Sequence, residues 1–221
     1  MSPEIEQFIK ENIGLIEQNT KESWEELYKK FPPRNFTETL LEAGIDPALT
    51  LEYLPNNYLF HSDIEFFDIP DNCKYIGFGA FKYCYNLKTI QIPNNVEAIE
   101  TYSFSSCRNL EEIFFNRNLK EIFPGAFDSC ENLKTIDLSN TSLVSIGEEA
   151  FCSCSNLMEV ILPNSLINLN DKLFRNCNLL TEVIYKGSKR EAIIKLKVKN
   201  KNWRKYSAIS KIICTDGIIE L

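Results

Sequence analysis

The stretch that decides the fold is residues 76–98, which read IGFGAFKYCYNLKTIQIPNNVEA, because this pattern returns about every 23 residues. An isoleucine or leucine opens each copy, at Ile76, Ile99, Ile122, Ile146 and Leu169. A phenylalanine follows five residues later, at Phe81, Phe104, Phe127, Phe151 and Phe174. A cysteine comes three residues after each ring, at Cys84, Cys107, Cys130, Cys154 and Cys177. A repeat period of roughly 20 to 50 residues indicates a solenoid, in which each copy packs against its neighbours.

Two further columns predict a strand in each copy. An asparagine precedes a leucine at Asn86, Asn109, Asn132 and Asn156, and we expect these amides to satisfy backbone groups at the corner before the strand. The strand centres are Ile90, Ile113, Ile136, Val160 and Val183. Residues two apart in a strand face the same side, so alternate residues are expected inside and outside. A proline after the strand ends the hydrogen-bond ladder, at Pro70, Pro93 and Pro163.

The pattern I-x-x-x-A-F-x-x-C-x-N-L-x-x-I-x-[IL]-P-x-x-[VL] resembles the BspA-like leucine-rich repeat family, over Ile64 to about Tyr185. The resemblance implies an α/β leucine-rich repeat solenoid of about five 23-residue units with a parallel sheet, a helical N-terminal cap and a mixed C-terminal cap. Such repeats are binding scaffolds whose partners differ from protein to protein. The implied role is therefore binding, without a particular partner.

The sequence divides into three predicted segments: a helical N-terminal cap over 1–60, the repeats over 61–186 with a half unit from Ile64, and a C-terminal cap over 187–221. Caps are expected because a solenoid otherwise exposes an apolar end. The third repeat, 122–145, is one residue longer than the others, which predicts a looser turn near 139–142.

The N-terminal segment is expected to form short helices. Residues 4–18 have the apolar spacing of an amphipathic helix, and Asp46-Pro47 has the residues that open a helix, here one running to Tyr53. Whether these helices only cap the solenoid or also bind a partner stays open.

Residues 36–47, FTETLLEAGIDP, resemble the leader found on BspA-like repeat proteins of phages and prophages. That resemblance implies an intracellular protein made inside a bacterial cell, as a phage protein that binds or blocks a host factor. The first residues lack the basic and apolar regions of a secretory signal. Eight cysteines without such a signal fit reduced thiols, so we expect a cytoplasmic protein, in the bacterial host cell if phage-encoded.

Charge is distributed unevenly along the 221 residues, whose formal net charge is −7. Residues 61–185 hold 17 acids and 9 bases, whereas residues 186–221 hold 3 acids and 10 bases. An acidic body with a basic end can steer charged partners. No run of 18 apolar residues occurs, so no transmembrane helix is expected.

No motif predicts catalysis, a cofactor or a metal. The chain has no G-x-G-x-x-G, G-x-x-x-x-G-K-[ST] or H-E-x-x-H sequence, and its one histidine, His61, belongs to no recognisable nucleophile–base pair. Cys152 and Cys154 form the one close cysteine pair, and a zinc site would need two more ligands. The cysteine column is expected to be buried, as small apolar side chains are. We therefore predict a protein that is not an enzyme.

The strand residues that face outward provide the predicted partner-binding site. It holds five acids, four large apolar residues and no base among Phe66, Asp68, Gln91, Glu112, Phe114, Asp137, Glu159, Ile161, Glu182 and Ile184. Apolar anchors beside charge of one sign suit a protein interface, since anchors supply affinity and charge steers encounter. The expected partner is a protein with a basic patch.

Two alternatives remain open. A nucleic acid could contact the basic residues of the C-terminal segment, with Trp203 and Tyr206 available for stacking. These basic residues are Lys189, Arg190, Lys195, Lys197, Lys199, Lys201, Arg204 and Lys205. They equally suit a solvated capping face, and the acidic body makes nucleic acid the less favoured partner. The second alternative is a self-assembling scaffold, and the sequence leaves the oligomeric state undetermined.

Overall fold

The computed structural model describes most of the chain from residue 52 onward. The described residues are Gln7, Lys10, Glu11, Gly14, 52–54, 56–198 and 200–221. Most of the predicted N-terminal helical cap, including the leader over 36–47, lies outside them. Of the predicted helix over 4–18, the four described residues are helical.

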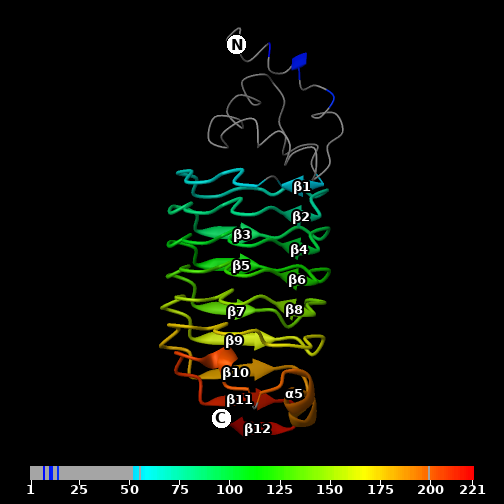
Figure 1. Cartoon of the computed structure of the whole chain (residues 1–221), viewed down its shortest axis with the longest axis vertical. Coiled ribbons are helices and arrows are strands. Elements are labelled where there is room, and N and C mark those ends of the chain that lie inside the picture. Colours follow the sequence, from blue (N-terminus) through cyan, green and yellow to red (C-terminus); the bar gives the residue numbers. More distant parts are fainter. Residues whose placement is uncertain (1–6, 8–9, 12–13, 15–51, 55, 199) are drawn as a thin grey trace.

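One flank of the solenoid is a ladder of two-residue parallel strands (Figure 1). In spatial order these strands are β1 (Tyr53–Leu54), β2 (Tyr75–Ile76), β4 (Ala98–Ile99), β6 (Glu121–Ile122) and β8 (Ser145–Ile146). Tyr53 pairs with Tyr75, so the first turn of the solenoid begins at Tyr53, upstream of the half unit expected from Ile64. Tyr53 was predicted to end a helix, and it lies in a strand instead.

A second flank carries the predicted strands in each turn from β3 (Thr89–Gln91) onward, whereas the first turn, which holds Phe66 and Asp68, has no strand there. β3 pairs with β5 (Glu112–Phe114). A five-stranded sheet follows, made of β7 (Thr135–Asp137), β9 (Glu159–Leu162), β10 (Glu182–Tyr185), β11 (Lys211–Cys214) and β12 (Gly217–Glu220). All neighbours are parallel except β11 and β12. The predicted leucine-rich repeat solenoid with a parallel sheet is confirmed.

The phenylalanine column forms a continuous stack through the core. The rings of Phe81, Phe104, Phe127, Phe151 and Phe174 lie parallel within 10°, with successive centroids 4.8, 5.2, 5.4 and 5.9 Å apart. All five rings are fully buried. Trp203, in the short 3₁₀ helix η1 (Asn202–Arg204), packs edge-on against the last ring at 6.4 Å and ends the stack. Each ring therefore contacts the rings of the adjacent turns, which holds the turns in one register.

The cysteine column is buried beside the ring stack, as the sequence predicts. Each thiol donates a hydrogen bond to a carbonyl oxygen of the preceding turn; Cys107 Sγ, for example, lies 3.1 Å from Phe81 O. The same contact measures 3.0 to 3.3 Å at Cys84, Cys130, Cys154 and Cys177. Burial raises the pKa of Cys84 to about 12. The Cys84 thiol is consequently protonated and a poor nucleophile at neutral pH.

The asparagine column follows its prediction at Asn86 and departs from it at later turns. Asn86 Nδ2 donates to the backbone carbonyl of Asp63 at 3.4 Å. Asn132 Nδ2 donates to Asn109 Oδ1 at 3.4 Å, and Asn156 Nδ2 to Asn132 Oδ1 at 3.5 Å, so these amides form a surface ladder between turns. The asparagine that satisfies buried backbone groups is Asn116, which donates to Pro93 O and Val96 O at 2.6 and 2.9 Å. Its Oδ1 also accepts from the N–H of Asn118 at 2.7 Å.

The long third repeat places its extra residue in a hydrogen-bonded turn, where a looser turn was predicted. Thr141 is buried, and its hydroxyl donates to Leu138 O at 2.8 Å. The Ser139 N–H donates to the carboxylate of Asp137 at 2.9 Å. These bonds contain the insertion within the corner, so the strand after it keeps its register.

The C-terminal segment closes the solenoid with a helix and a hairpin. Helix α5 (Lys189–Lys195) begins with a capping box, in which Ser188 Oγ accepts from Glu191 N and Glu191 Oε2 accepts from Ser188 N. These bonds to Ser188, together with Lys195, lower the pKa of Glu191 to about 2. β11 and β12 form the hairpin predicted from Asp216-Gly217.

Phe104→Ala is expected to lower the free energy of unfolding by about 3 to 5 kcal/mol, because it removes a buried ring from the stack. Urea denaturation followed by circular dichroism measures this change. Phe66→Ala is the matched control, since Phe66 is 75% exposed and its loss is expected to change stability by less than about 0.5 kcal/mol. Equal losses in the two variants would contradict the role of the stack.

Asn116→Ala is expected to lower the free energy of unfolding by about 1 to 3 kcal/mol, because it leaves two buried carbonyls and the N–H of Asn118 without their partner. Asn109→Ala changes the same residue type on the surface and is expected to cost less than about 0.5 kcal/mol. A larger loss for Asn109→Ala in the same urea experiment would show that the exposed ladder is the stabilising column.

Candidate functional site

The outward residues of β3, β5, β7, β9 and β10 form one surface, called here the sheet face. In β3 and β7 the central isoleucine is buried and both neighbours are exposed, as the alternation predicts. The register places Gln91 beside Phe114, and Asp137 beside Ile161, which in turn lies beside Ile184. Side chains about 23 residues apart in sequence are therefore neighbours on this face.

The ten predicted site residues lie at the surface, with two degrees of exposure. Ile161, Glu182 and Ile184 are half-buried. The other seven are exposed, namely Phe66, Asp68, Gln91, Glu112, Phe114, Asp137 and Glu159. Phe66 and Asp68 belong to no strand, although the bond from Lys88 N to Glu65 O joins their turn to the next one. The structure brings the other eight together on the sheet face.

The prediction that the face carries no base needs correction, because β11 extends it. Lys211 pairs in register with Glu182, and their charged groups lie 3.0 Å apart as an ion pair. Ile213 likewise extends the apolar row beyond Ile184. In the sequence, the alternation of Lys211, Ile212 and Ile213 could have indicated a further strand of this face. These residues were assigned to the C-terminal cap instead. One of the five predicted acids is thus paired within the protein.

The sheet face is interrupted once, by a hollow between β5 and β7. Its volume is about 450 Å³, and it is lined by Glu111, Glu112, Ile113, Phe114, Lys134, Thr135 and Asp137. β5 and β7 occupy successive turns and are not paired as strands in the described sheets. The sequence analysis predicted a continuous sheet and did not anticipate this hollow.

Phe115 distinguishes the turn in which the sheet opens. Other turns have Ile92, Leu138, Leu162 or Tyr185 in this column, and all four are buried. The Phe115 ring is instead half-buried and packs edge-on against Phe127, with centroids 5.9 Å apart. A ring in this column does not by itself separate strands, because β10, which carries Tyr185, pairs with both of its neighbours.

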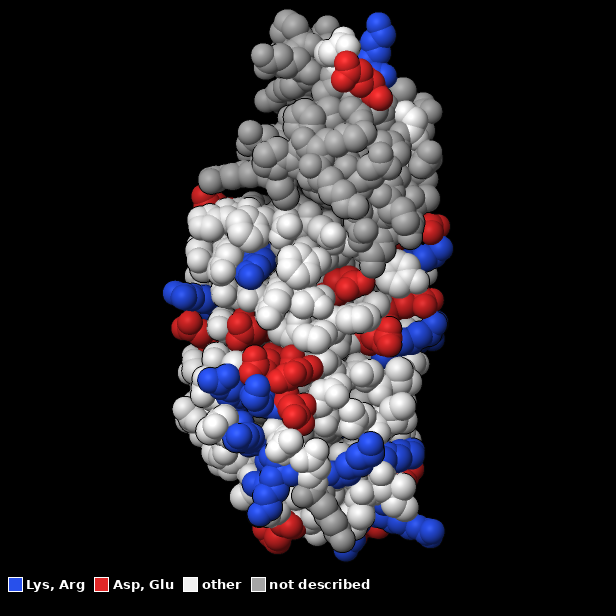
Figure 2. Space-filling view, viewed as in Figure 1, with Lys and Arg blue, Asp and Glu red and all other residues white. Residues whose placement is uncertain are grey.

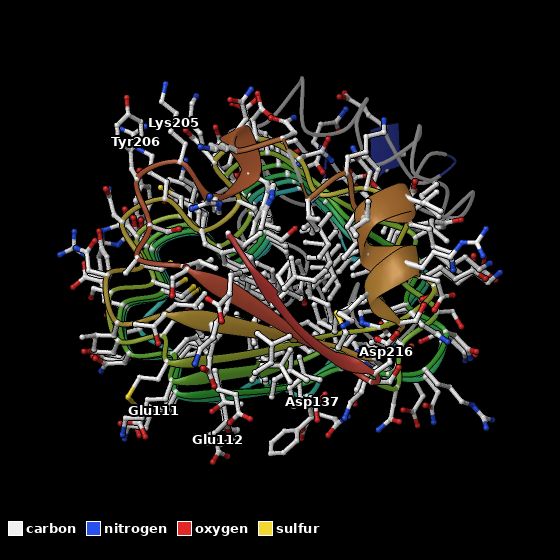
Figure 3. The ribbon with its side chains drawn as sticks, turned by 90° about the horizontal axis from the view of Figure 1, so that it is seen from below. Glu111, Glu112, Asp137, Lys205, Tyr206 and Asp216 are labelled. Carbon is white, nitrogen blue, oxygen red and sulfur yellow. The ribbon has the colours of Figure 1, made fainter. Side chains whose placement is uncertain are left out.

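Carboxylates surround the hollow. Glu111, Glu112 and Asp137 lie along one side of the molecule and point outward from it (Figure 3). In the described part of the chain none of the three forms an ion pair, and Lys134 is the single basic residue in the lining. Phe114 lies among them with 51% of its surface exposed. The site combines an accessible ring with unneutralised negative charge.

An aromatic cluster on the flank near the first turns was not predicted. His61 lies edge-on to Tyr85 with centroids 5.5 Å apart, and Phe60 lies edge-on to Tyr83 at 5.4 Å. Lys82 Nζ lies 5.1 Å from the centroid of the Tyr83 ring. His61 and Tyr83 occupy the same turn position in adjacent repeats, both with left-handed backbone, at φ of 60° and 64°. The available signal was their equivalent place in the repeat, two residues after Leu59 and Phe81.

The basic C-terminal segment offers less for nucleic acid than the sequence suggests. Trp203 was expected to be available for stacking, but it is fully buried against the ring stack. Tyr206 is 59% exposed, and Lys205 Nζ lies 5.0 Å from its ring centroid. Basic side chains gather toward the C-terminal end of the face seen in Figure 2. Of the two aromatic residues predicted to be available for stacking, Tyr206 alone is exposed beside these basic side chains.

The close cysteine pair shows no arrangement for metal binding. Among the described residues, no group of three or more His, Cys, Asp or Glu side chains is placed to hold a metal ion. Burial raises the pKa of Cys152 to about 11, so this thiol is protonated at neutral pH.

Among the residues that the structure describes, no helix has the length and apolar character needed to cross a bilayer.

The chain is similar to several solved bacterial structures. The T. pallidum leucine-rich repeat protein is 30% identical over 60% of this chain, with a TM-score of 0.57. A leucine-rich cell surface protein of Faecalibacterium prausnitzii is 28% identical over 61% of this chain, also with a TM-score of 0.57. The pneumococcal vaccine antigen PcpA, 22% identical over 63%, shares the fold with a TM-score of 0.52.

This chain spans 62%, 35% and 33% of the lengths of those three proteins. Among proteins with curated descriptions, none matches it. The family model described as BspA type leucine-rich repeat region matches residues 52–181 in six copies, which is more than half of the chain. Because this match agrees with the stacked turns of the structure, the chain belongs to the BspA type leucine-rich repeat family.

Proposed function

We propose that this protein is a non-enzymatic recognition module that binds a protein partner on its sheet face. The observation that carries this proposal is the juxtaposition on one surface of unpaired acids and apolar side chains, with Phe114 between Glu112 and Asp137 around the hollow. The acids favour a partner with a basic patch, and the apolar residues supply the area that becomes buried.

The rigidity of the scaffold supports this role. Each strand of the face is part of a turn that contacts its neighbours through the ring stack and the thiol–carbonyl bonds. A preformed surface loses little conformational entropy when it binds, so more of the contact energy appears as affinity.

The area of the face sets a limit on what it binds alone. Six turns spaced by about 4.8 Å, with about 17 Å of strand, give roughly 400 Å². A standard interface uses about 800 Å² on each partner. β11 adds Lys211 and Ile213 to the face, and further area must come from loops, the N-terminal segment or a second copy.

The cellular setting is part of the same proposal. All eight cysteines are unpaired and buried, which is compatible with the reducing cytoplasm expected from the sequence. The leader-like sequence over 36–47 supports a phage-encoded protein acting on a host protein. Blocking a host factor would require only that the sheet face cover the surface that the factor uses.

Phe114→Asp is expected to reduce capture of the partner at least tenfold, because it places a fourth carboxylate at the hollow and removes an apolar anchor. Tagged wild type and variant are incubated with lysate of the source organism, and captured proteins are quantified by mass spectrometry. Ile167→Asp is the matched control, since Ile167 is also exposed and its backbone joins the turn at Val144 on the other flank.

Folding of both variants is checked by their thermal unfolding temperature. Partners captured equally by wild type, Phe114→Asp and Ile167→Asp would show that the sheet face is not the binding surface. Loss of capture with Ile167→Asp alone would place the interface on the opposite flank.

A further inference from the structure

We propose that the hollow between β5 and β7 receives an arginine side chain of the protein partner. This assignment rests on the proposed function and specifies the central contact of the sheet face. Three features support it: backbone groups left without a neighbouring strand, carboxylates that are not neutralised, and an exposed ring at the rim.

Backbone pairing is lost at this one junction of the face. Glu111 N donates to Lys88 O at 2.8 Å, and Met158 N donates to Lys134 O at 2.9 Å. The equivalent bond, from Lys134 N to Glu111 O, is absent between the described turns.

The far end of the same junction is also unpaired. Ile92 N donates to Phe114 O and Leu138 N to Ile161 O, both at 2.9 Å. The corresponding bond from Phe115 N to Asp137 O is missing in this described segment. The two missing bonds leave the carbonyl oxygens of Glu111 and Asp137, and the N–H groups of Lys134 and Phe115, without each other as partners. A guanidinium group can use the carbonyl acceptors.

The charge of the lining selects a cation. Glu111, Glu112 and Asp137 contribute three negative charges, against the single positive charge of Lys134. The three carboxylates repel one another, and a cationic side chain in the hollow would offset part of this repulsion. An anionic side chain would be repelled by the carboxylates, and a neutral donor would gain hydrogen bonds with them but no charge attraction.

The shape and the ring favour arginine over lysine. A guanidinium group is planar, donates up to five hydrogen bonds and stacks on aromatic faces, whereas an ammonium group is a compact, strongly hydrated charge. Phe114 presents its exposed ring at the rim of the hollow. The volume of about 450 Å³ is sufficient for a guanidinium group with its aliphatic stem.

The test is an NMR titration of the ¹⁵N-labelled full chain with three blocked amino acids. N-acetyl-arginine methylamide is expected to shift the backbone amides of Phe114 and Thr135 progressively. N-acetyl-citrulline methylamide has nearly the same shape without the charge, and it is expected to bind at least tenfold more weakly. N-acetyl-lysine methylamide is expected to bind at least threefold more weakly than the arginine probe.

Charge variants locate the binding. Glu112→Gln with Asp137→Asn is expected to weaken the arginine probe at least fivefold. Glu121→Gln with Asp71→Asn removes the same charge from exposed residues outside the hollow, and it is expected to leave the probe affinity within a factor of two. Equal effects of the two double variants would overturn the proposal, as would equal binding of the lysine and arginine probes.

Phe115→Leu tests the cause of the hollow while keeping the core apolar. Leucine is the residue at this position in the next two turns, Leu138 and Leu162, and the smaller side chain is expected to let β5 and β7 pair. The amides of Lys134 and residue 115 should then gain protection from hydrogen exchange, and arginine binding should fall at least fivefold. A folded Phe115→Leu variant that binds the arginine probe as wild type does would overturn the proposal.

The outcome is separable from that of the proposed function. Partner capture that depends on Phe114 while the arginine probe fails to bind would remove this assignment and leave the sheet face as the interface. Arginine binding in the hollow with a partner that is captured equally by Phe114→Asp would remove both the sheet-face interface and the assignment of the arginine to that partner.

Discussion

The contact of each phenylalanine ring with the ring in the next turn fixes the spacing of the whole solenoid. Successive centroids lie 4.8 to 5.9 Å apart, close to the distance of about 4.8 Å that separates hydrogen-bonded strands. Ring stacking and strand pairing therefore demand nearly the same repeat distance. Stacked rings therefore bring adjacent turns close to the distance at which strands pair, although β5 and β7 stay unpaired while Phe104 and Phe127 stack at 5.2 Å.

The sheet face follows from this spacing and from one departure from it. Where the column residue is aliphatic, as at Ile92 or Leu138, adjacent turns close on each other and the strands pair. In the turn of Phe115 the column ring is only half-buried, and β5 and β7 are unpaired, whereas the buried ring of Tyr185 leaves β10 paired on both sides. The main irregularity of the outer surface therefore coincides with the one column side chain among these strands that is not fully buried.

The periodic features of this protein could be predicted from its sequence, because each column repeats one chemical requirement. The buried cysteines and the strands were found this way, and the hairpin was found from the Asp216-Gly217 turn sequence. Features that depend on a single residue were missed. The Asn116 bonds and the hollow at Phe115 arise where one repeat departs from the pattern, and the burial of Trp203 arises where the cap meets the last ring.

The burial of the cysteines has a practical consequence for labelling this protein. All eight native cysteines are buried, and desolvation holds the pKa of Cys84 and Cys107 above that of a free thiol. Maleimides react with accessible thiolates, so the native chain presents them with few targets. One cysteine introduced on the surface would then accept a fluorophore or spin label selectively, without replacement of any native residue. The repeats would serve as a ruler, because labels placed one turn apart differ in height by one strand spacing.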